Sequence, residues 1–354
     1  MNTKLNKCQK LRIGRLVVLF LFAIFVLSPL DGALAQSDEQ HRAKLIEGAK
    51  KEGKAVWYAA MGGQDSDKLM KEFEKKYPFV KMECYRAGAE KILARVLEEA
   101  RADRHIFDVT DNGILEGLTI KTKGIFGKYL SPERKYYSDV DKDPEGYWTG
   151  IYANKVVVMY NTKLVAPKDV PKTYEDLLDP KWKGKMGMDT KAYYELAVLM
   201  KIMGGGEKGL NFVRKLSEQN IQFRTGRTLV GTMVIAGEMS MGLFIYNHSI
   251  EEVKGKGAPV DWVALEPVID KTHPFGVAAR APHPNAGRLF TDYVLSREGQ
   301  EVIASFYRVP TRSDVEAMVP RLKVKDKKTF PPDASFVNDF EKYAKLYRTV
   351  LMKK

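Results

Sequence analysis

The sequence predicts an α/β protein of two lobes, each built on a central, mostly parallel sheet with helices on its faces. The chain has 354 residues, enough for two domains at a prior of roughly 150 residues each. Strand-like runs alternate with helix-like runs over residues 55–118 and again over residues 185–307. Between the two series lies GYWTGIYANKVVVMYNT, residues 146–162. We expect this stretch to carry the chain from one lobe into the other.

The central stretch contains the apolar run Val156–Tyr160, which the turn-forming pair Asn161-Thr162 closes. Successive apolar residues without polar alternation are typical of a strand covered on both faces, as in a parallel sheet flanked by helices. The predicted lobes are residues 36–150 with 266–310, and residues 151–265 with 311–354.

The N-terminus has the pattern of a secretory signal peptide. Five basic residues precede the apolar run Leu16–Leu27, and Ala33-Leu34-Ala35 is a small-x-small cleavage site. The alternative is a retained membrane anchor, but the apolar run is shorter than the roughly 20 residues that a membrane-spanning helix needs. We therefore expect residues 1–35 to be removed, with the mature chain starting near Gln36.

Cysteine usage and charge limit the functional classes. Cys8 lies before the apolar run, so Cys84 is the one cysteine of the expected mature chain and no internal disulfide can form there. A bacterial periplasm is the natural compartment.

The formal net charge is +13 overall and about +9 without the signal segment, which favours anionic partners. Lysine and glutamate alternate on helix faces as on solvated surfaces, and no arginine-rich arm is present, so we expect no nucleic-acid partner.

The first series of elements begins with a strand at residues 55–60. A helix stopped by Pro78 follows, and then strands at 80–84 and 106–110, each followed by a helix. The apolar positions that recur at helical spacing in these helices are Leu69, Met70, Phe73, Tyr77, Ile92, Leu93, Val96, Leu97, Ala100, Ile114, Leu115 and Leu118.

The second series repeats the alternation. We expect strands at residues 185–188, 221–224, 239–246, 260–265 and 275–279. Helices are expected at residues 193–203, 207–220, 229–236, 248–254, 285–295, 297–307 and 334–352.

Motifs for catalysis are absent from the sequence. Gly204, Gly206 and Gly209 match G-x-G-x-x-G, but they follow a helix rather than a strand, so they predict a helix–helix turn and no dinucleotide site. The chain has no HExxH, CxxC, G-x-S-x-G or G-K-S/T motif, and its histidines are scattered. We therefore expect no enzyme activity, no cofactor and no resident metal.

Loops that join a strand to a following helix are the candidate ligand site. Ligands of open α/β sheets bind at the carboxyl ends of strands, and helix N-termini favour anions. Such loops lie at residues 61–63, 86–90, 111–113, 189–193, 224–228 and 246–249. Arg86, Arg224 and Arg227 can form bidentate pairs with phosphate or carboxylate, unless each is an ordinary surface arginine.

Several of these segments also resemble a known family. VWYAA, GYWTGIYANKVVVMYNT, YEDLLDPKWKGKMGM, AGEMSMGLFIYNHS and APHPNAGRLFTDYVLSREGQEVIA are similar to the periplasmic substrate-binding proteins of ABC importers, in the group that takes ferric iron and phosphonates. The resemblance spans nearly the whole mature chain. It implies a type II periplasmic binding fold, with two α/β lobes joined by a hinge of crossing strands. It also implies a solute held between the lobes and docking on a membrane permease.

The resemblance leaves the ligand open. Glu90 matches the position of a glutamate that iron-binding members use, but their adjacent tyrosine pair is replaced after Tyr246 by Asn247 and His248. A histidine of the first loop is also missing. We therefore favour a small organic anion, such as a phosphonate, sugar phosphate or carboxylate, with Fe(III) as the alternative.

The sequence thus predicts a periplasmic, monomeric solute-binding protein that does not transform its ligand. A secreted enzyme and a sensor partner of a membrane kinase are the rivals from other classes. The candidate ligand-binding residues are Met61, Gly62, Arg86, Glu90, Asn112, Tyr152, Tyr193, Arg224, Thr225, Arg227, Thr228, Tyr246, Asn247 and His248.

Overall fold

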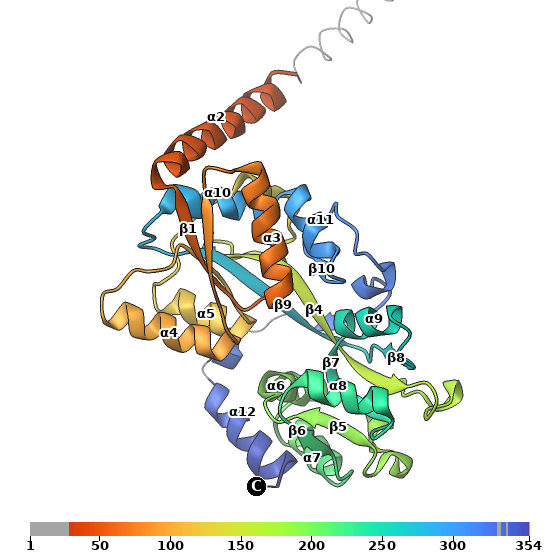
Figure 1. The fold of residues 1–354 in the computed structure, drawn as a ribbon. Helices are drawn as coiled ribbons and strands as arrows, with labels where there is room; N and C mark the ends of the chain where they lie inside the picture. Colours follow the sequence, from red (N-terminus) through yellow and green to blue (C-terminus); the bar gives the residue numbers. More distant parts are fainter. Residues whose placement is uncertain (1–27, 331–333, 338, 354) are drawn as a thin grey trace, which may run out of the picture.

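The protein folds into two α/β lobes that share one continuous mixed sheet (Figure 1). The computed structural model describes residues 28–330, 334–337 and 339–353. Along the sheet the strand order is β2-β1-β3-β9-β4-β7-β5-β6, with β8 and β10 paired to β4 and β11 paired to β9. The α/β fold class predicted from the sequence is confirmed.

The strands are β1 (Lys54–Ala59), β2 (Lys81–Arg86), β3 (Val109–Asp111), β4 (Thr149–Asn161), β5 (Met186–Asp189), β6 (Gln222–Arg224), β7 (Met241–Tyr246), β8 (Val260–Val263), β9 (Val268–Val277), β10 (Val309–Pro310) and β11 (Thr329–Phe330). The α-helices are α2 (Ser28–Glu52), α3 (Gly63–Lys76), α4 (Ala89–Arg101), α5 (Ile114–Thr122), α6 (Tyr193–Ile202), α7 (Gly206–Ser217), α8 (Arg227–Ala236), α9 (Asn247–Gly255), α10 (Pro284–Leu295), α11 (Arg297–Ala304) and α12 (Phe340–Leu346). A short helical turn, η1, spans Pro132–Tyr136.

Each lobe has a parallel block of the sheet, as the alternating pattern predicted. In the first lobe β1 pairs in parallel with β2 and β3, and in the second β5 pairs in parallel with β6 and β7. Helices α3 and α10 pack on the first block through Phe73 and Phe290, whose rings lie 5.0 Å apart. The carboxyl ends of β2 and β5 therefore lead into helices, which is where ligands bind in such sheets.

The two parallel blocks are joined by the long strands β4 and β9. Strand β4 is buried along nearly its whole length, as its apolar run predicted. Its partners β9, β7 and β8 are all antiparallel, however, so the parallel pairing expected for this strand is wrong. A bulge between Val157 and Met159 interrupts its register with β7. An apolar run reports burial on both faces, and that is equally compatible with an antiparallel strand at the centre of a sheet.

Strand β9 begins earlier than the sequence predicted, at Val268 rather than at Phe275. Polar residues interrupt its first half and hide the strand pattern, but each has a partner on a neighbouring element. Asp270 pairs with Lys155 of β4, and Lys271 pairs with Glu195 of α6. His273 contacts Tyr152 and Asn154 of β4. These contacts place charged groups on the strands that connect the lobes.

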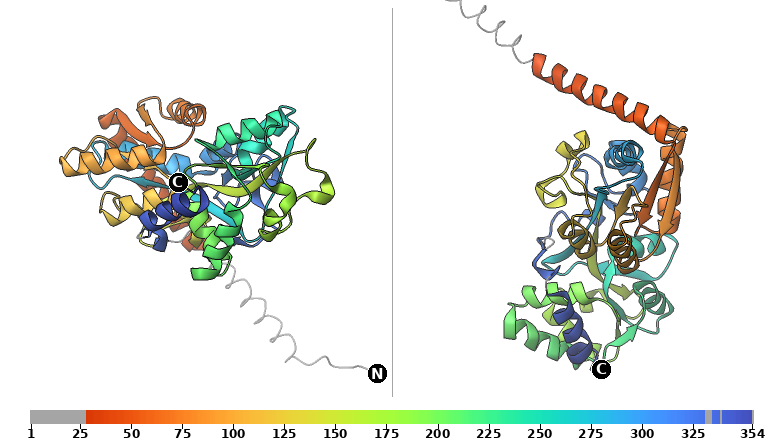
Figure 2. Two further views of the ribbon diagram at one scale, coloured as in Figure 1. Left: turned by 90° about the horizontal axis from the view of Figure 1, so that it is seen from below. Right: turned by 90° about the vertical axis from the view of Figure 1, so that its left-hand side faces the viewer.

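Helix α2 extends away from the body of the first lobe, with its C-terminal part packed on α10 (Figures 1 and 2). The predicted signal peptide lies mostly outside the described residues, and its last part, from Ser28, belongs to α2. In the described part of the chain, no helix combines the length and the apolar character that crossing a bilayer requires.

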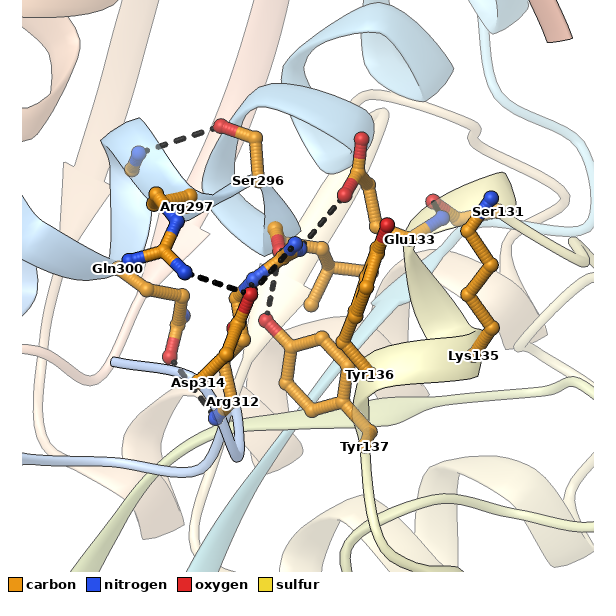
Figure 3. Close-up of polar contacts among 12 residues, drawn as sticks. Ser131, Glu133, Lys135, Tyr136, Tyr137, Ser296, Arg297, Gln300, Arg312 and Asp314 are labelled. Carbon is orange, nitrogen blue, oxygen red and sulfur yellow. Dashed lines mark hydrogen bonds and ion pairs between the residues drawn. The ribbon is translucent and has the colours of Figure 1, made fainter. Parts of the chain in front are cut away.

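A buried arginine ties together three segments of the chain. Arg312 donates to Glu133 of η1 at 2.6 Å, to Asp314 at 2.7 Å and to the carbonyl of Leu295 at 3.0 Å. Its guanidinium lies 3.9 Å from the ring centre of Tyr136 (Figure 3). The segment that follows β10 is thereby fixed to η1 and to the α10–α11 turn.

Candidate functional site

A cleft of about 580 Å³ lies where helices of both lobes begin. Helices α4 and α5 start at its wall in the first lobe, and α6, α8 and α9 start at its wall in the second. Strand β9 adds Lys271 and His273 between them. The lining residues are Tyr85, Arg86, Ala87, Gly88, Ala89, Glu90, Lys91, Gly113, Ile114, Leu115, Glu116, Asp189, Lys191, Tyr193, Tyr194, Glu195, Arg227, Tyr246, Lys271 and His273.

Glu195 joins two cations on the second-lobe wall. The carboxylate is 1% exposed, and its Oε1 accepts from Arg227 Nη2 at 2.6 Å and from Lys271 Nζ at 2.9 Å. Burial raises the pKa of this carboxyl, but the charges of Arg227 and Lys271 outweigh it, so the pKa lies below its ordinary value. Its Oε2 is buried and has no hydrogen-bond partner among the described residues.

Asp189, at the end of β5, holds the neighbouring loops in place. Its Oδ1 accepts the backbone N–H of Gly226 at 3.0 Å and that of Lys191 at 3.3 Å. Its Oδ2 lies 3.6 Å from Nη1 of Arg227. Arg227 also donates its Nε to the carbonyl of Phe244 at 3.0 Å. The guanidinium is therefore fixed at the start of α8 by acceptors from three elements.

The first-lobe wall presents less constrained cations. Arg86 donates Nε to the carbonyl of Met61 at 3.2 Å, and its terminal nitrogens contact no acceptor among the described residues. Across the cleft, Lys191 Nζ lies 2.9 Å from Glu90 Oε2, and both side chains are 53% exposed. An exposed pair of this kind contributes about 0–1 kcal/mol, so it does not by itself hold the lobes together.

Aromatic rings lie beside the cations of the second lobe. The ring of Tyr246 is 4.7 Å from the Arg227 guanidinium, and the ring of Tyr194 is 5.0 Å from Lys271 Nζ. Tyr193 stacks edge-on against Tyr347 at 5.3 Å. These rings provide a partly apolar surface next to fixed positive charge.

The floor of the cleft is a buried polar cluster on the crossing strands. His273 Nδ1 lies 2.9 Å from the Tyr152 hydroxyl, and its Nε2 lies 3.0 Å from Asn154 Nδ2. Burial lowers the pKa of His273, with Arg308 and Lys271 adding to the effect and Asp111 opposing it. Arg308 lies 4.4 Å from the Tyr152 ring and pairs with Asp65. The floor histidine is therefore neutral at pH 7.

Five of the residues predicted from the sequence line the cleft: Arg86, Glu90, Tyr193, Arg227 and Tyr246. The other nine predicted residues are not among its lining residues: Met61, Gly62, Asn112, Tyr152, Arg224, Thr225, Thr228, Asn247 and His248.

These nine residues have other surroundings. Met61 is fully buried, and the buried Asn112 and Asn247 bond to backbone groups of Gly113 and Leu322. Gly62 precedes α3 beside Arg308, and Tyr152 contacts His273 beneath the cleft.

Arg224 bonds to the carbonyl of its neighbour Phe223, and Thr225 lies 3.5 Å from Thr190. Thr228 is exposed, and its carbonyl accepts from Thr232. His248 stacks on Tyr246 at 5.9 Å, and burial holds its pKa well below the ordinary value.

Sequence reasoning missed several lining residues, in particular Glu116, Glu195 and Lys271. Glu116 and Glu195 lie two or three residues beyond predicted loops, in the first turn of α5 and of α6. The helical turn that begins at a strand end also faces the site, so a search extended by one turn would have found both. Lys271 lies in the half of β9 that the sequence pattern did not reveal.

Within the described residues, no three His, Cys, Asp or Glu side chains converge as a metal site. Three of the cleft carboxylates are already in ion pairs, Glu90 with Lys191 and both Asp189 and Glu195 with Arg227. The arrangement can bind a negatively charged solute through free guanidinium nitrogens, helix N-termini and ammonium groups.

The chain is similar to several known bacterial proteins. It is 26% identical over 274 residues to an uncharacterized protein of Haemophilus influenzae, covering 72% of this chain and 76% of that protein. It is 25% identical over 170 residues to the Fe(3+)-binding periplasmic protein of Serratia marcescens, covering 45% of this chain and about half (49%) of that protein.

Solved structures share the fold. The iron-bound HitA of Pseudomonas aeruginosa superposes with a TM-score of 0.75 at 22% identity, over 84% of this chain and 99% of that one. AfuA of Actinobacillus pleuropneumoniae, with fructose-6-phosphate bound, superposes with a TM-score of 0.66 at 24% identity, over 85% of this chain and 97% of that one.

The model of one protein family matches residues 108–338, well over half of the sequence, and this segment contributes both crossing strands and the whole second-lobe wall of the cleft. Proteins of this family bind solutes for transport, and the resemblance noted from the sequence is confirmed. The chain belongs to the family of bacterial extracellular solute-binding proteins.

Proposed function

We propose that this protein captures a small organic anion in the periplasm and delivers it, unchanged, to the permease of an ABC importer. The observation that carries the proposal is the charge of the cleft. Five cationic side chains line it, Arg86, Lys91, Lys191, Arg227 and Lys271, against the four carboxylates Glu90, Glu116, Asp189 and Glu195. Helices α4, α6, α8 and α9 also begin there, and the N–H groups at their first turns favour an anion.

The size of the cleft supports an organic solute. A volume of about 580 Å³ lies within the range of small-molecule sites, roughly 300–1,000 Å³. The tyrosine rings beside Arg227 and Lys271 provide a surface for the uncharged part of such a solute. A phosphonate, a sugar phosphate or a carboxylate meets these requirements, and AfuA, which shares the fold, has fructose-6-phosphate bound.

Fe(III) is the second candidate, because phenol and carboxyl oxygens of Tyr85, Tyr193, Tyr246 and Glu90 line the same cleft. HitA, which shares the fold, is described as iron-bound. Against this candidate, Arg227 and Lys271 lie next to Tyr246 and repel a trivalent cation unless an anion accompanies it.

Native mass spectrometry of the mature protein purified from the periplasm tests the proposal first. An increment of an organic anion, recovered unchanged after denaturation, supports it, and an increment of one iron contradicts it. Isothermal titration with fructose 6-phosphate, 2-aminoethylphosphonate, citrate and ferric citrate then tests the ligand classes. Arg227→Gln is expected to weaken binding of the anion about tenfold or more, since charge-assisted hydrogen bonds are worth roughly 1.5–3 kcal/mol.

The transport role has its own measurement. Crosslinking in intact cells is expected to join the protein to a permease of the inner membrane, and size-exclusion chromatography with light scattering to show a monomer. Recovery of a membrane kinase instead would favour the sensor role. Conversion of the solute during incubation would favour an enzyme.

A further inference from the structure

Glu116 differs from the other carboxylates of the cleft because it forms no ion pair with a cationic side chain in the described part of the chain. Glu90 pairs with Lys191, and Asp189 and Glu195 pair with Arg227. Glu116 forms no ion pair and no hydrogen bond with another side chain of the described residues, although it lines the same cleft. Burial raises the pKa of its carboxyl, against its own backbone N–H and the charge of Lys271.

The position of Glu116 keeps its carboxylate at the start of α5. A side chain at Gly113, which precedes α5, would overlap Glu116 Oε2 and lie 3.3 Å from its Cδ. At Gly88, which precedes α4, the corresponding space is open, with no atom within 4 Å. The N-terminus of α5 is therefore covered by its own carboxylate, whereas that of α4 is open beside Arg86.

The starts of α4 and α5 favour different chemical groups of one bound solute. An anionic group fits the α4 side, where Arg86 has free terminal nitrogens. At the α5 side an anionic group would meet the Glu116 carboxylate, whereas a hydroxyl or an ammonium would donate to it. When a bound solute lacks such a donor, the partly buried carboxyl of Glu116 is left without a hydrogen-bond partner, which is unfavourable. Glu116 can therefore discriminate between solutes with and without a hydroxyl or ammonium donor.

We propose that Glu116 is a specificity-determining residue that accepts a hydrogen bond from the solute, so that the preferred ligand is an anion that also carries a hydroxyl or ammonium donor. This inference rests on the anion-binding function proposed above. It distinguishes amino-phosphonates and polyol phosphates from simple alkyl phosphonates, monocarboxylates and inorganic ions.

Matched probes test the proposal by isothermal titration with the mature protein. Ethylphosphonate, 2-hydroxyethylphosphonate and 2-aminoethylphosphonate differ only in the terminal donor, and propyl phosphate with glycerol 3-phosphate forms a second series. We expect the donor-bearing member of at least one series to bind roughly tenfold more tightly than its donor-free partner, because a site that loses a hydrogen-bond partner discriminates strongly.

Two variants then assign the preference to Glu116. In Glu116→Met the carboxyl is lost, so the donor-bearing and donor-free probes should bind within about twofold of each other. In Glu116→Gln an acceptor oxygen remains without charge, so a preference for hydroxyl should persist and a preference for ammonium should fall. Glu207→Gln, which removes an exposed glutamate of α7 that pairs with Arg214, is the matched control and should keep the wild-type preference.

Each remaining outcome overturns the inference. If both members of each series bind equally to the wild type, or if the donor preference survives in Glu116→Met, then Glu116 only covers the start of α5. In that case its substitution should change the melting temperature alone. If no phosphonate, phosphate ester or carboxylate binds at all, the anion-binding function fails together with the inference.

Discussion

Glu195 shows at the residue scale why a buried carboxylate persists in this cleft. It is almost fully buried and neutralises Arg227 and Lys271, which come from different elements of the chain. Without the carboxylate, two cations would face each other in a medium of low polarity. Glu195 therefore positions the two groups that we propose to bind the anion.

Glu195→Gln is expected to destabilise the protein by about 3 kcal/mol at pH 7, because Lys271 loses its counter-charge and Arg227 keeps only Asp189, and both cations are largely shielded from solvent. The pKa of Glu195 is lower in the folded than in the unfolded protein, so this contribution is present at neutral pH. It is lost as the pH falls from about 4.5, the ordinary value, through the lower pKa of the folded protein. Urea unfolding of both proteins at pH 7 and at pH 3 measures it, and an equal difference at both values would contradict the assignment.

His273 predicts a second pH dependence, with its origin on the crossing strands. The folded protein holds its pKa below the ordinary value of about 6.5, so the unfolded chain takes up a proton first on acidification. Stability should therefore fall between pH 7 and pH 5, by up to about 1.4 kcal/mol per pH unit for this one group. In His273→Gln the slope of unfolding free energy against pH should be shallower. An unchanged slope would assign the dependence to other groups, such as His248.

At the element scale, the glycine-rich motif lies at the turn between α6 and α7, as its position in the sequence predicted, and its last glycine serves helix packing. Gly209 of α7 lies against the end of α6, and a Cβ there would meet the Met200 carbonyl group, 2.9 Å from its carbon. Each of the atoms it would meet belongs to the backbone, so a larger residue forces the two helices apart. Close approach of α6 and α7 keeps Tyr193 and Glu195 at the cleft.

Gly209→Ala should therefore destabilise the protein by about 1–2 kcal/mol, since overpacking outweighs the better helix propensity of alanine. Gly63→Ala is the matched control, because a Cβ at this first residue of α3 meets no atom within 4 Å. Thermal unfolding should show a lower midpoint for Gly209→Ala than for the wild type, and an unchanged midpoint for Gly63→Ala. If Gly209→Ala were as stable as the wild type, the close approach of the two helices would have little energetic weight.

At the scale of the whole molecule, the chain passes between the lobes on β4 and β9 and is fixed to the first lobe again at Arg312. This guanidinium is 4% exposed, and its partners come from three separated segments, η1, the α10–α11 turn and the residues after β10 (Figure 3). The network keeps the segment that leads away from β10 in a defined position relative to the cleft floor.

Arg312→Met is expected to cost about 3 kcal/mol of stability, because it removes the buried cation between Glu133 and Asp314 and the donor to the Leu295 carbonyl, and Asp314 keeps only the exposed Arg297. Arg297→Met is the matched control: Arg297 pairs with the same Asp314 at 2.9 Å but is 55% exposed. Exposed pairs contribute little, so this variant should stay within about 1 kcal/mol of the wild type. Chemical denaturation measures the free energy of unfolding of both variants. An equal loss of stability in Arg312→Met and Arg297→Met would contradict the importance of the buried network.

Much of the fold follows from local pattern. The alternation of strands and helices predicted the two parallel blocks, and the apolar run of β4 predicted its burial on both faces. Because strand ends precede helix starts in such blocks, the sequence also placed Arg86, Glu90, Tyr193, Arg227 and Tyr246 at the cleft. These features depend on residues that are close together in the chain.

Tertiary structure alone decided which side chains meet. Lys271 reaches Glu195 because β9 runs antiparallel to β4, a pairing between segments over a hundred residues apart that no local periodicity encodes. Thr225 lies in a predicted loop, but its hydroxyl lies 3.5 Å from that of Thr190 and it is not among the lining residues of the cleft. The sequence by itself predicted the α/β class, the alternation of strands and helices, and loops that contribute five residues to the cleft. The direction of each side chain, and the counter-charges that shape the cleft, came from contacts between helices, loops and strands that are distant in the sequence.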